Sequence, residues 1–121
     1  MSIIALAVGG CREDIRNDIL CPAAIYPGIE VTVKDSRTGQ SIADGAVGVA
    51  REGAYLDSLR AASFQGTTVL SLAGALGRAG TYTVTVERSG YVTWTKSNVD
   101  VERGACGVVT THLTANLVPS P

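Results

Sequence analysis

The chain has few of the side chains that metal or acid–base chemistry requires. Its 121 residues include one histidine, one methionine and three cysteines, and ten basic residues nearly balance eleven acidic ones. His112 stands alone and the cysteine spacings do not suit a zinc site, so a Cys/His metal cluster is excluded. The balanced charge also excludes the broadly basic surface of a nucleic-acid-binding protein. We therefore predict no metal, no cofactor and no nucleic-acid partner.

Recognisable catalytic motifs are missing as well. The chain contains neither the G-x-S-x-G order of a nucleophile elbow nor the G-x-x-x-x-G-K-[ST] order of a phosphate-binding loop. His112 falls in the last predicted strand on the face opposite Leu113, which predicts a solvent-facing or edge histidine. We expect no catalytic residue in this chain.

No hydrophobic run is long enough to cross a bilayer, which takes about 20 apolar residues. The longest is MSIIALAVGG at residues 1–10. Two interpretations fit it: a buried first strand, or the end of a secretory signal. Val8-Gly9-Gly10-Cys11 resembles the lipobox of bacterial lipoproteins, which implies removal of residues 1–10 and a lipid on Cys11. Residues 12–26 then form a tether between the membrane and the domain.

The chain contains many segments in which apolar and polar residues alternate with period two, and glycines separate these segments. Ile29, Val31 and Val33 alternate with polar residues, and Tyr82, Val84 and Val86 do the same. Such segments, separated by turn signals every eight to twelve residues, are typical of an antiparallel β-sandwich. The predicted strands are 28–34, 42–50, 54–59, 67–72, 80–86, 91–96 with continuation over 98–101, and 106–117.

The odd number of cysteines is explained if Cys11 carries the lipid. Cys21 and Cys106 then remain, just before the first predicted strand and at the start of the last. If those strands are neighbours, the two cysteines form a disulfide that closes a loop of about 85 residues, worth roughly 4.5 kcal/mol in the chain-entropy model. The alternative is two buried free thiols.

Two stretches resemble carboxypeptidase regulatory-like domains, which are also described as transthyretin-like or prealbumin-like. The first is GIEVTVKD at 28–35 with the following Thr38-Gly39 and IADGAV at 42–47; the second is AGTYTVTVE at 79–87 with Gly90-Tyr91. The likeness covers roughly residues 27–118 and leaves 60–79 unmatched. It implies an all-β fold, namely a seven- to eight-stranded antiparallel Greek-key β-sandwich, in an accessory module without catalytic residues.

The closer likeness is to small bacterial envelope lipoproteins that carry one such domain, in which a cysteine before the first strand pairs with one that opens the last. We expect a signal remnant at 1–11, a tether at 12–26, the domain at 27–118 and a tail at 119–121. The resemblance implies a structural or binding role in the cell envelope, with a membrane anchor at Cys11 and an envelope protein or glycan as partner.

Two other functions remain open. The first is a carbohydrate-binding module in which Tyr91 and Trp94 stack on a sugar. Trp94 belongs to the core if Val92 points inward, and to a surface patch with Lys96 otherwise. The second is a transthyretin-related hydrolase, which a single histidine and the ending Val118-Pro119-Ser120-Pro121 do not support.

The position of a binding surface is also a matter of prediction. Residues 60–79 are rich in glycine and small polar residues, and we expect a short strand within a loop there that contacts the partner. Tyr91, which follows Gly90, is expected to close a corner of the fold with its hydroxyl on the backbone. Strand edges that are rich in threonine and poor in charge further allow an edge-paired oligomer.

Overall fold

The computed structural model describes residues 21 and 24–121, and in them the fold is all-β with eight strands. In this part of the chain, no helix has the length and apolar character needed to cross a bilayer. The proposed lipid site at Cys11 lies outside the described residues. The strands are β1 Pro27–Asp35, β2 Val47–Glu52, β3 Tyr55–Gln65, β4 Thr68–Leu76, β5 Gly80–Glu87, β6 Trp94–Gly104, β7 Gly107–Val109 and β8 Thr111–Leu117.

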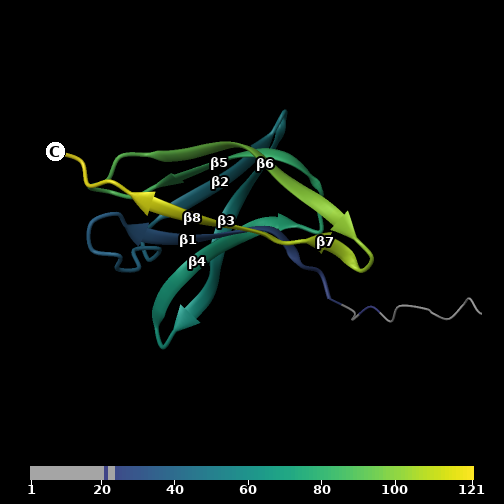
Figure 1. Ribbon diagram of the computed structural model, residues 1–121, viewed down its shortest axis with the longest axis horizontal. Coiled ribbons are helices and arrows are strands. Elements are labelled where there is room, and N and C mark those ends of the chain that lie inside the picture. The colour runs from purple at the N-terminus through teal and green to yellow at the C-terminus, as the bar shows by residue number, and fades with distance from the viewer. Residues whose placement is uncertain (1–20, 22–23) are drawn as a thin grey trace, which may run out of the picture.

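The strands form one mixed sheet in the order β7-β6-β5-β2-β3-β4-β1-β8. The sheet curls until its ends approach each other, with β2 and β5 on one side of the molecule and β1 and β4 on the other (Figure 1). Two hydrogen bonds link the β6 region to the β8 region, where the ends of the sheet approach each other. The Thr111 hydroxyl donates to the Asp100 carbonyl at 2.6 Å, and the Val92 amide donates to the Val118 carbonyl at 2.8 Å. The sheet is therefore nearly closed, in the manner of a barrel.

One pair of neighbours corrects the expectation of antiparallel pairing throughout. β1 and β8 pair in parallel, from Ile29 opposite Thr111 to Asp35 opposite Leu117. Short connections favour antiparallel neighbours because a parallel pair needs a long crossover. β1 and β8 are the first and last strands, so the whole domain serves as their crossover and that constraint does not apply.

Alternation along the strands separates the core from the surface. The predicted inward residues Tyr82, Val84 and Val86 are confirmed, each at most 1% exposed. On β1, the inward residues Ile29, Val31 and Val33 are completely buried, as period two predicts. The remaining core comes from the other strands and one loop: Ala43, Ala50, Leu59, Leu72, Ala75, Val99, Val101, Val108, Ala115 and Leu117.

Several strand boundaries differ from the predictions, including the start of β6 at Trp94 in place of residue 91. β2 begins at Val47, because residues 42–46 form a loop in which Gly45 has a φ of +83°. Residues 60–79 contain most of the β3–β4 hairpin and are not a loop with one short strand. The predicted last strand is broken at Thr110 into β7 and β8, and the break reverses the alternation, so that Val108 is buried and Val109 exposed.

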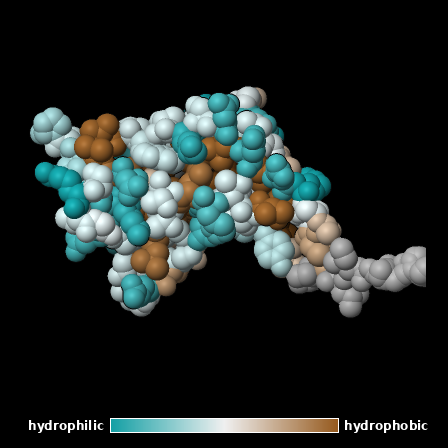
Figure 2. Space-filling model, viewed as in Figure 1, coloured by the Kyte–Doolittle hydropathy of each residue, from teal (hydrophilic) through white to brown (hydrophobic). Residues whose placement is uncertain are grey.

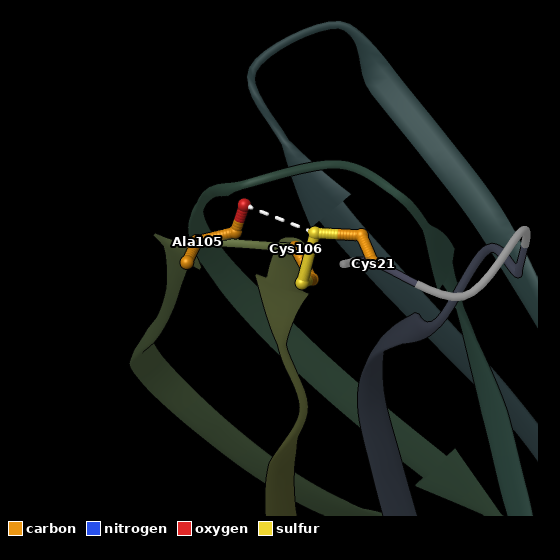
Figure 3. The surroundings of a disulfide bond; sticks show 3 residues. All are labelled: Cys21, Ala105 and Cys106. Atoms are coloured by element: carbon orange, nitrogen blue, oxygen red, sulfur yellow. Dashed lines mark hydrogen bonds between the residues drawn. A yellow bond between two sulfur atoms is a disulfide. The ribbon is translucent and has the colours of Figure 1, made fainter. Parts of the chain in front are cut away.

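A disulfide joins Cys21 to Cys106, whose Cα atoms lie 5.2 Å apart. It ties the segment that leads into β1 to the turn between β6 and β7, and the Cys21 sulfur lies 3.6 Å from the carbonyl oxygen of Ala105 (Figure 3). The predicted pairing is confirmed. The bridge lies near the end of the barrel where the chain enters, and the C-terminus lies at the opposite end (Figure 1).

Candidate functional site

The outer face of β2 and its neighbours carries a hollow of about 190 Å³. Its position follows from an unusual alternation in β2, where Gly48 and Ala50 point into the core and the larger Val47 and Val49 point outward. Space inside explains this choice: a Cβ on Gly48 would lie only 2.9 Å from a methyl group of Leu59. The lining consists of Val47, Val49, Arg51, Leu56, Thr83, Thr85 and Glu87.

Two opposite charges lie at the two ends of this hollow. Arg51 pairs in register with Thr83, and Glu87 pairs with Val47, so the charges are four residues apart along β2. At about 3.4 Å per residue, this separates them by roughly 13 Å along the strands. Among the described residues, neither forms an ion pair. The floor between them is aliphatic, with threonine hydroxyls along β5.

A second hollow of about 360 Å³ lies beside the first, at the β5–β6 turn, and shares Val47 and Glu87 with it. The Arg88 guanidinium lies over the Tyr91 ring, 5.7 Å from its centre. The lining is Gly45, Val47, Glu87, Arg88, Ser89, Gly90, Tyr91 and Thr93. This surface combines one aromatic ring with charged and hydroxyl groups.

Tyr91 and Trp94, the predicted stacking pair, lie in different surroundings. Tyr91 lines the second hollow, whereas Trp94 does not and instead packs, half-buried, against the core. Trp94 was expected to belong to the core only if Val92 points inward. Val92 is 50% exposed although Trp94 packs against the core, so this condition is wrong. The alternation fails there because β6 begins only at Trp94, and Tyr91 makes no more than an isolated bridge to Pro119.

Asp35 links the end of β1 to Tyr91. Its Oδ1 accepts hydrogen bonds from the amides of Arg37 at 2.7 Å and Thr38 at 3.0 Å, within the turn that follows β1. Its Oδ2 accepts the Tyr91 hydroxyl at 2.7 Å, so this hydroxyl reaches a carboxylate and not the backbone as expected. The Tyr91 hydroxyl and the two amides lower the pKa of Asp35.

Replacing Tyr91 with phenylalanine is expected to reduce stability more where Asp35 is ionised than where it is protonated, because the charged carboxylate accepts the stronger hydrogen bond. The native pKa of Asp35 is below its unfolded value, so the stability from its hydrogen bonds is present above about pH 4 and is lost as the pH falls through the native pKa. Chemical unfolding of wild type and Tyr91→Phe at pH 7 and at pH 2.5 measures this difference. Tyr26→Phe is the control, and an equal loss at both pH values would contradict the prediction.

Glu30 is the centre of a hydroxyl–carboxylate cluster on the outer side of β1. Its Oε2 accepts the Ser63 hydroxyl at 2.6 Å and the Ser71 hydroxyl at 2.5 Å, while Nδ1 of His112 lies 3.7 Å from its Oε1. Hydrogen bonds from Ser63 and then Ser71 lower the pKa of Glu30. His112 is 71% exposed, which confirms the predicted solvent-facing histidine.

The order of groups in this cluster does not fit a nucleophile triad. In a triad the imidazole lies between the hydroxyl and the carboxylate, so that it can accept the hydroxyl proton. Here the carboxylate lies between the hydroxyls and the imidazole, and a carboxylate with a lowered pKa is a weak base. The cluster connects β1, β3, β4 and β8 and is suited to holding them together.

Removing one hydroxyl of this cluster should raise the pKa of Glu30. In Ser71→Ala the carboxylate keeps Ser63 but loses a donor that stabilises its ionised form. Carboxyl carbon shifts of Glu30 in an NMR pH titration measure the change. Ser58→Ala, an exposed serine outside the cluster, is the control; an unmoved Glu30 titration in Ser71→Ala would be evidence against the cluster.

A third cluster of polar side chains surrounds Arg78, which lies between β4 and β5. Arg78 donates to Glu52 Oε1 at 2.7 Å and to the Tyr82 hydroxyl at 3.0 Å, and its guanidinium lies over the Tyr55 ring at 3.7 Å. Glu52 also accepts the Thr81 amide at 2.8 Å. These bonds join the β2–β3 turn to the start of β5. Over the described residues, no three His, Cys, Asp or Glu side chains gather as a metal site would require.

Sequence reasoning missed both hollows and the polar clusters around Glu30 and Arg78. One signal for the first hollow was present: the order V-G-V-A in β2, in which small residues alternate with larger ones. The partners of Glu30 carried no such signal, because Ser63 and Ser71 lie in the segment that has no clear period. No protein family model matches the chain, and no curated protein matches it either.

Proposed function

We propose that this chain is a non-catalytic, carboxypeptidase regulatory-like domain of a bacterial cell-envelope lipoprotein, with a structural or binding role. The observation that carries the proposal is the disulfide between Cys21 and Cys106. Disulfides persist in oxidising compartments and are rare in the cytosol. A small domain stapled in this way suits the envelope, where the lipobox-like sequence before Cys11 would place it.

The course of β3 supports the prealbumin-like sandwich as part of the proposal. Its first half, Tyr55–Leu59, pairs with β2, and its second half, Arg60–Gln65, pairs with β4. The strands thus fall into one group of β6, β5, β2 and β3 and another of β4, β1 and β8. A sandwich consists of two such layers, and β3 is the strand that passes from one group to the other.

The chemistry of the described polar groups supports a role without catalysis. Hydroxyls and carboxylates are engaged with each other in the Glu30 cluster and in the Asp35–Tyr91 pair. In neither place does an imidazole accept a hydroxyl proton, which is the step that would activate a nucleophile. Each group joins strands or turns that are distant in sequence.

The structure offers a second candidate for the surface that contacts a partner. Residues 60–79 were expected to contact the partner, but Ser71, Leu72 and Ala75 of this segment are buried. Half of the segment is exposed, and the tip of the β3–β4 hairpin, with Phe64, projects from the body (Figure 1). The second hollow, around Arg88, Tyr91 and Thr93, is a further candidate for the contact surface.

The test of the envelope proposal is expression of the whole chain in a bacterium, followed by fractionation and intact-mass measurement. We expect the protein in the membrane fraction, a mass about 2 Da below that of the dithiol form because of the bridge, and a lipid mass on Cys11. Cys11→Ser is the control and should release the protein from the membrane. A cytosolic product with three free thiols would overturn the proposal.

A carbohydrate ligand is the second candidate, favoured by the ring and hydroxyls of the second hollow. Sugars stack on aromatic faces and bond to hydroxyl and charged groups, and Tyr91, Thr93 and Arg88 offer these. Titration of NMR spectra with envelope glycan fragments should shift residues of this hollow. Tyr91→Phe keeps the ring and should bind, whereas Tyr91→Leu should not; shifts confined to other surfaces would exclude this site.

A further inference from the structure

The outer face of β2 exposes aliphatic side chains that the core does not use. Val47 is 60% exposed and Leu56 is 51% exposed, and Val49 lies between them in the floor of the first hollow. Gly48 and Ala50 fill the inward positions, and Leu59 and Leu72 leave no room for a larger residue at Gly48. Exposing the valines costs the free energy that their burial would provide, about 25 cal/mol for each Å².

Other exposed apolar side chains lie singly or in small groups, such as Val92 beside Val118. In the view of Figure 2 the apolar surface forms separate small groups among polar residues. Ile25 and Val118, for example, belong to the segments at the two ends of the domain, whereas Val47, Val49 and Leu56 come from adjacent strands and line one hollow. Contiguous apolar residues with a polar rim are typical of interaction surfaces.

We propose that this face, lined by Val47, Val49, Arg51, Leu56, Thr83, Thr85 and Glu87, is the interface of a symmetric homodimer. This dimer proposal does not depend on the envelope function proposed above. We call this set the β2 face. Two copies would pack sheet against sheet about a two-fold axis that lies between the faces and crosses the strands over the paired residues Val49 and Thr85.

The charges of the β2 face select a second copy as the occupant. Such an axis exchanges the two ends of the hollow, so Arg51 of each copy meets Glu87 of the other, and two ion pairs form for one dimer. The same rotation brings Leu56, which is level with Arg51 in register, towards Val47 of the partner. An interface that a two-fold axis builds must be complementary to itself, and the charges of this face are.

The area of the face sets the expected strength. The face spans three strands, β3, β2 and β5, about 4.8 Å apart, and up to five residues along them, so its area is below the roughly 800 Å² that each partner buries in a standard interface. We therefore expect a dissociation constant in the range of about 10 μM to 1 mM, with strong dependence on salt. The lipid-anchored form would reach such concentrations more readily, because anchoring confines it to a surface.

The experiment is sedimentation equilibrium of the full chain with Cys11→Ser, at protein concentrations up to about 1 mM in low and high salt. Wild-type sequence at the β2 face should dimerise, and Arg51→Glu or Glu87→Arg should each weaken the dimer by at least about tenfold, since either change sets like charges against each other. An equimolar mixture of the two variants should form a heterodimer, and the double reversal should restore the homodimer.

The controls separate this result from other causes of association. Arg103→Glu, a charge reversal near the β6–β7 turn and outside the β2 face, should dimerise like wild type. Circular dichroism should confirm that every variant is folded, which is expected because Arg51 and Glu87 are both exposed. A chain that stays monomeric at every concentration overturns the proposal, and so does a dimer that both single reversals leave intact.

Discussion

Unfolding of the Cys21→Ser/Cys106→Ser variant is expected to require roughly 4 kcal/mol less free energy than unfolding of the wild type. The bridge closes a loop of 85 residues. In the chain-entropy model, opening a loop of this length returns about 4.5 kcal/mol of conformational freedom to the unfolded chain, and measured values are often lower. A domain of this size is stable by about 5–15 kcal/mol, so the loss is a substantial fraction of the total.

The loss should appear as a shift of the denaturation midpoint in urea, with the slope changed because the unfolded variant is more expanded. Wild type in reducing agent should behave like the double serine variant, since both lack the same bond. Cys11→Ser keeps the bridge and is the matched control. A reduced wild type as stable as the oxidised form would mean that the loop between the two cysteines is already constrained in the unfolded state.

The positions of β1 and β5 could be predicted from sequence because their inward residues are all large and their outward residues all polar. Period two then identifies both the strand and the face that it buries. The turns after β1 could also be predicted, because Asp35 and Gly39 have turn chemistry that acts within a few residues; Gly39 takes a φ of +75°. Information of this kind is local, and it survives in a single sequence.

The sequence predicts the first part of β4, as the strand 67–72, but not its continuation to Leu76, because the residues there fit neighbours that are distant in sequence. Gly74 weakens the apparent strand propensity, yet a Cβ there would lie 2.5 Å from a methyl group of Leu59 and 2.9 Å from Asp57 Oδ2. The glycine is therefore required by the approach of β3, and glycine in a strand commonly marks such close contact. The sequence shows that residue 74 is glycine, but not that Leu59 and Asp57 lie beside it.

The parallel β1–β8 pair and the two hollows share this dependence on long-range register. That Arg51 and Glu87 lie at opposite ends of one hollow follows from the pairing of β2 with β5, over which Val47 is opposite Glu87. A shift of one residue would turn one of the two strands over and place its charged residue on the other face. Neither residue has a local motif, so the candidate interface becomes visible only once the register is known.

Tyr82→Ala is expected to destabilise the protein by about 3–5 kcal/mol, because it removes the largest buried side chain of the core. The Tyr82 ring also meets the Tyr55 ring edge-on, with 6.1 Å between their centres, so the truncation breaks an aromatic pair as well. For a domain of this length, such a loss lowers the melting temperature by roughly 15–30 °C. Differential scanning calorimetry measures it directly.

Tyr82→Phe separates the ring from its hydroxyl and is the matched control. The hydroxyl donates to the Arg78 carbonyl at 2.8 Å and accepts from the Arg78 guanidinium at 3.0 Å, so its loss loosens the β4–β5 connection without opening a cavity. We expect a much smaller fall in melting temperature than for alanine. If the two variants melted together, the hydroxyl bonds to Arg78, and not the volume of the ring, would be what Tyr82 contributes to the fold.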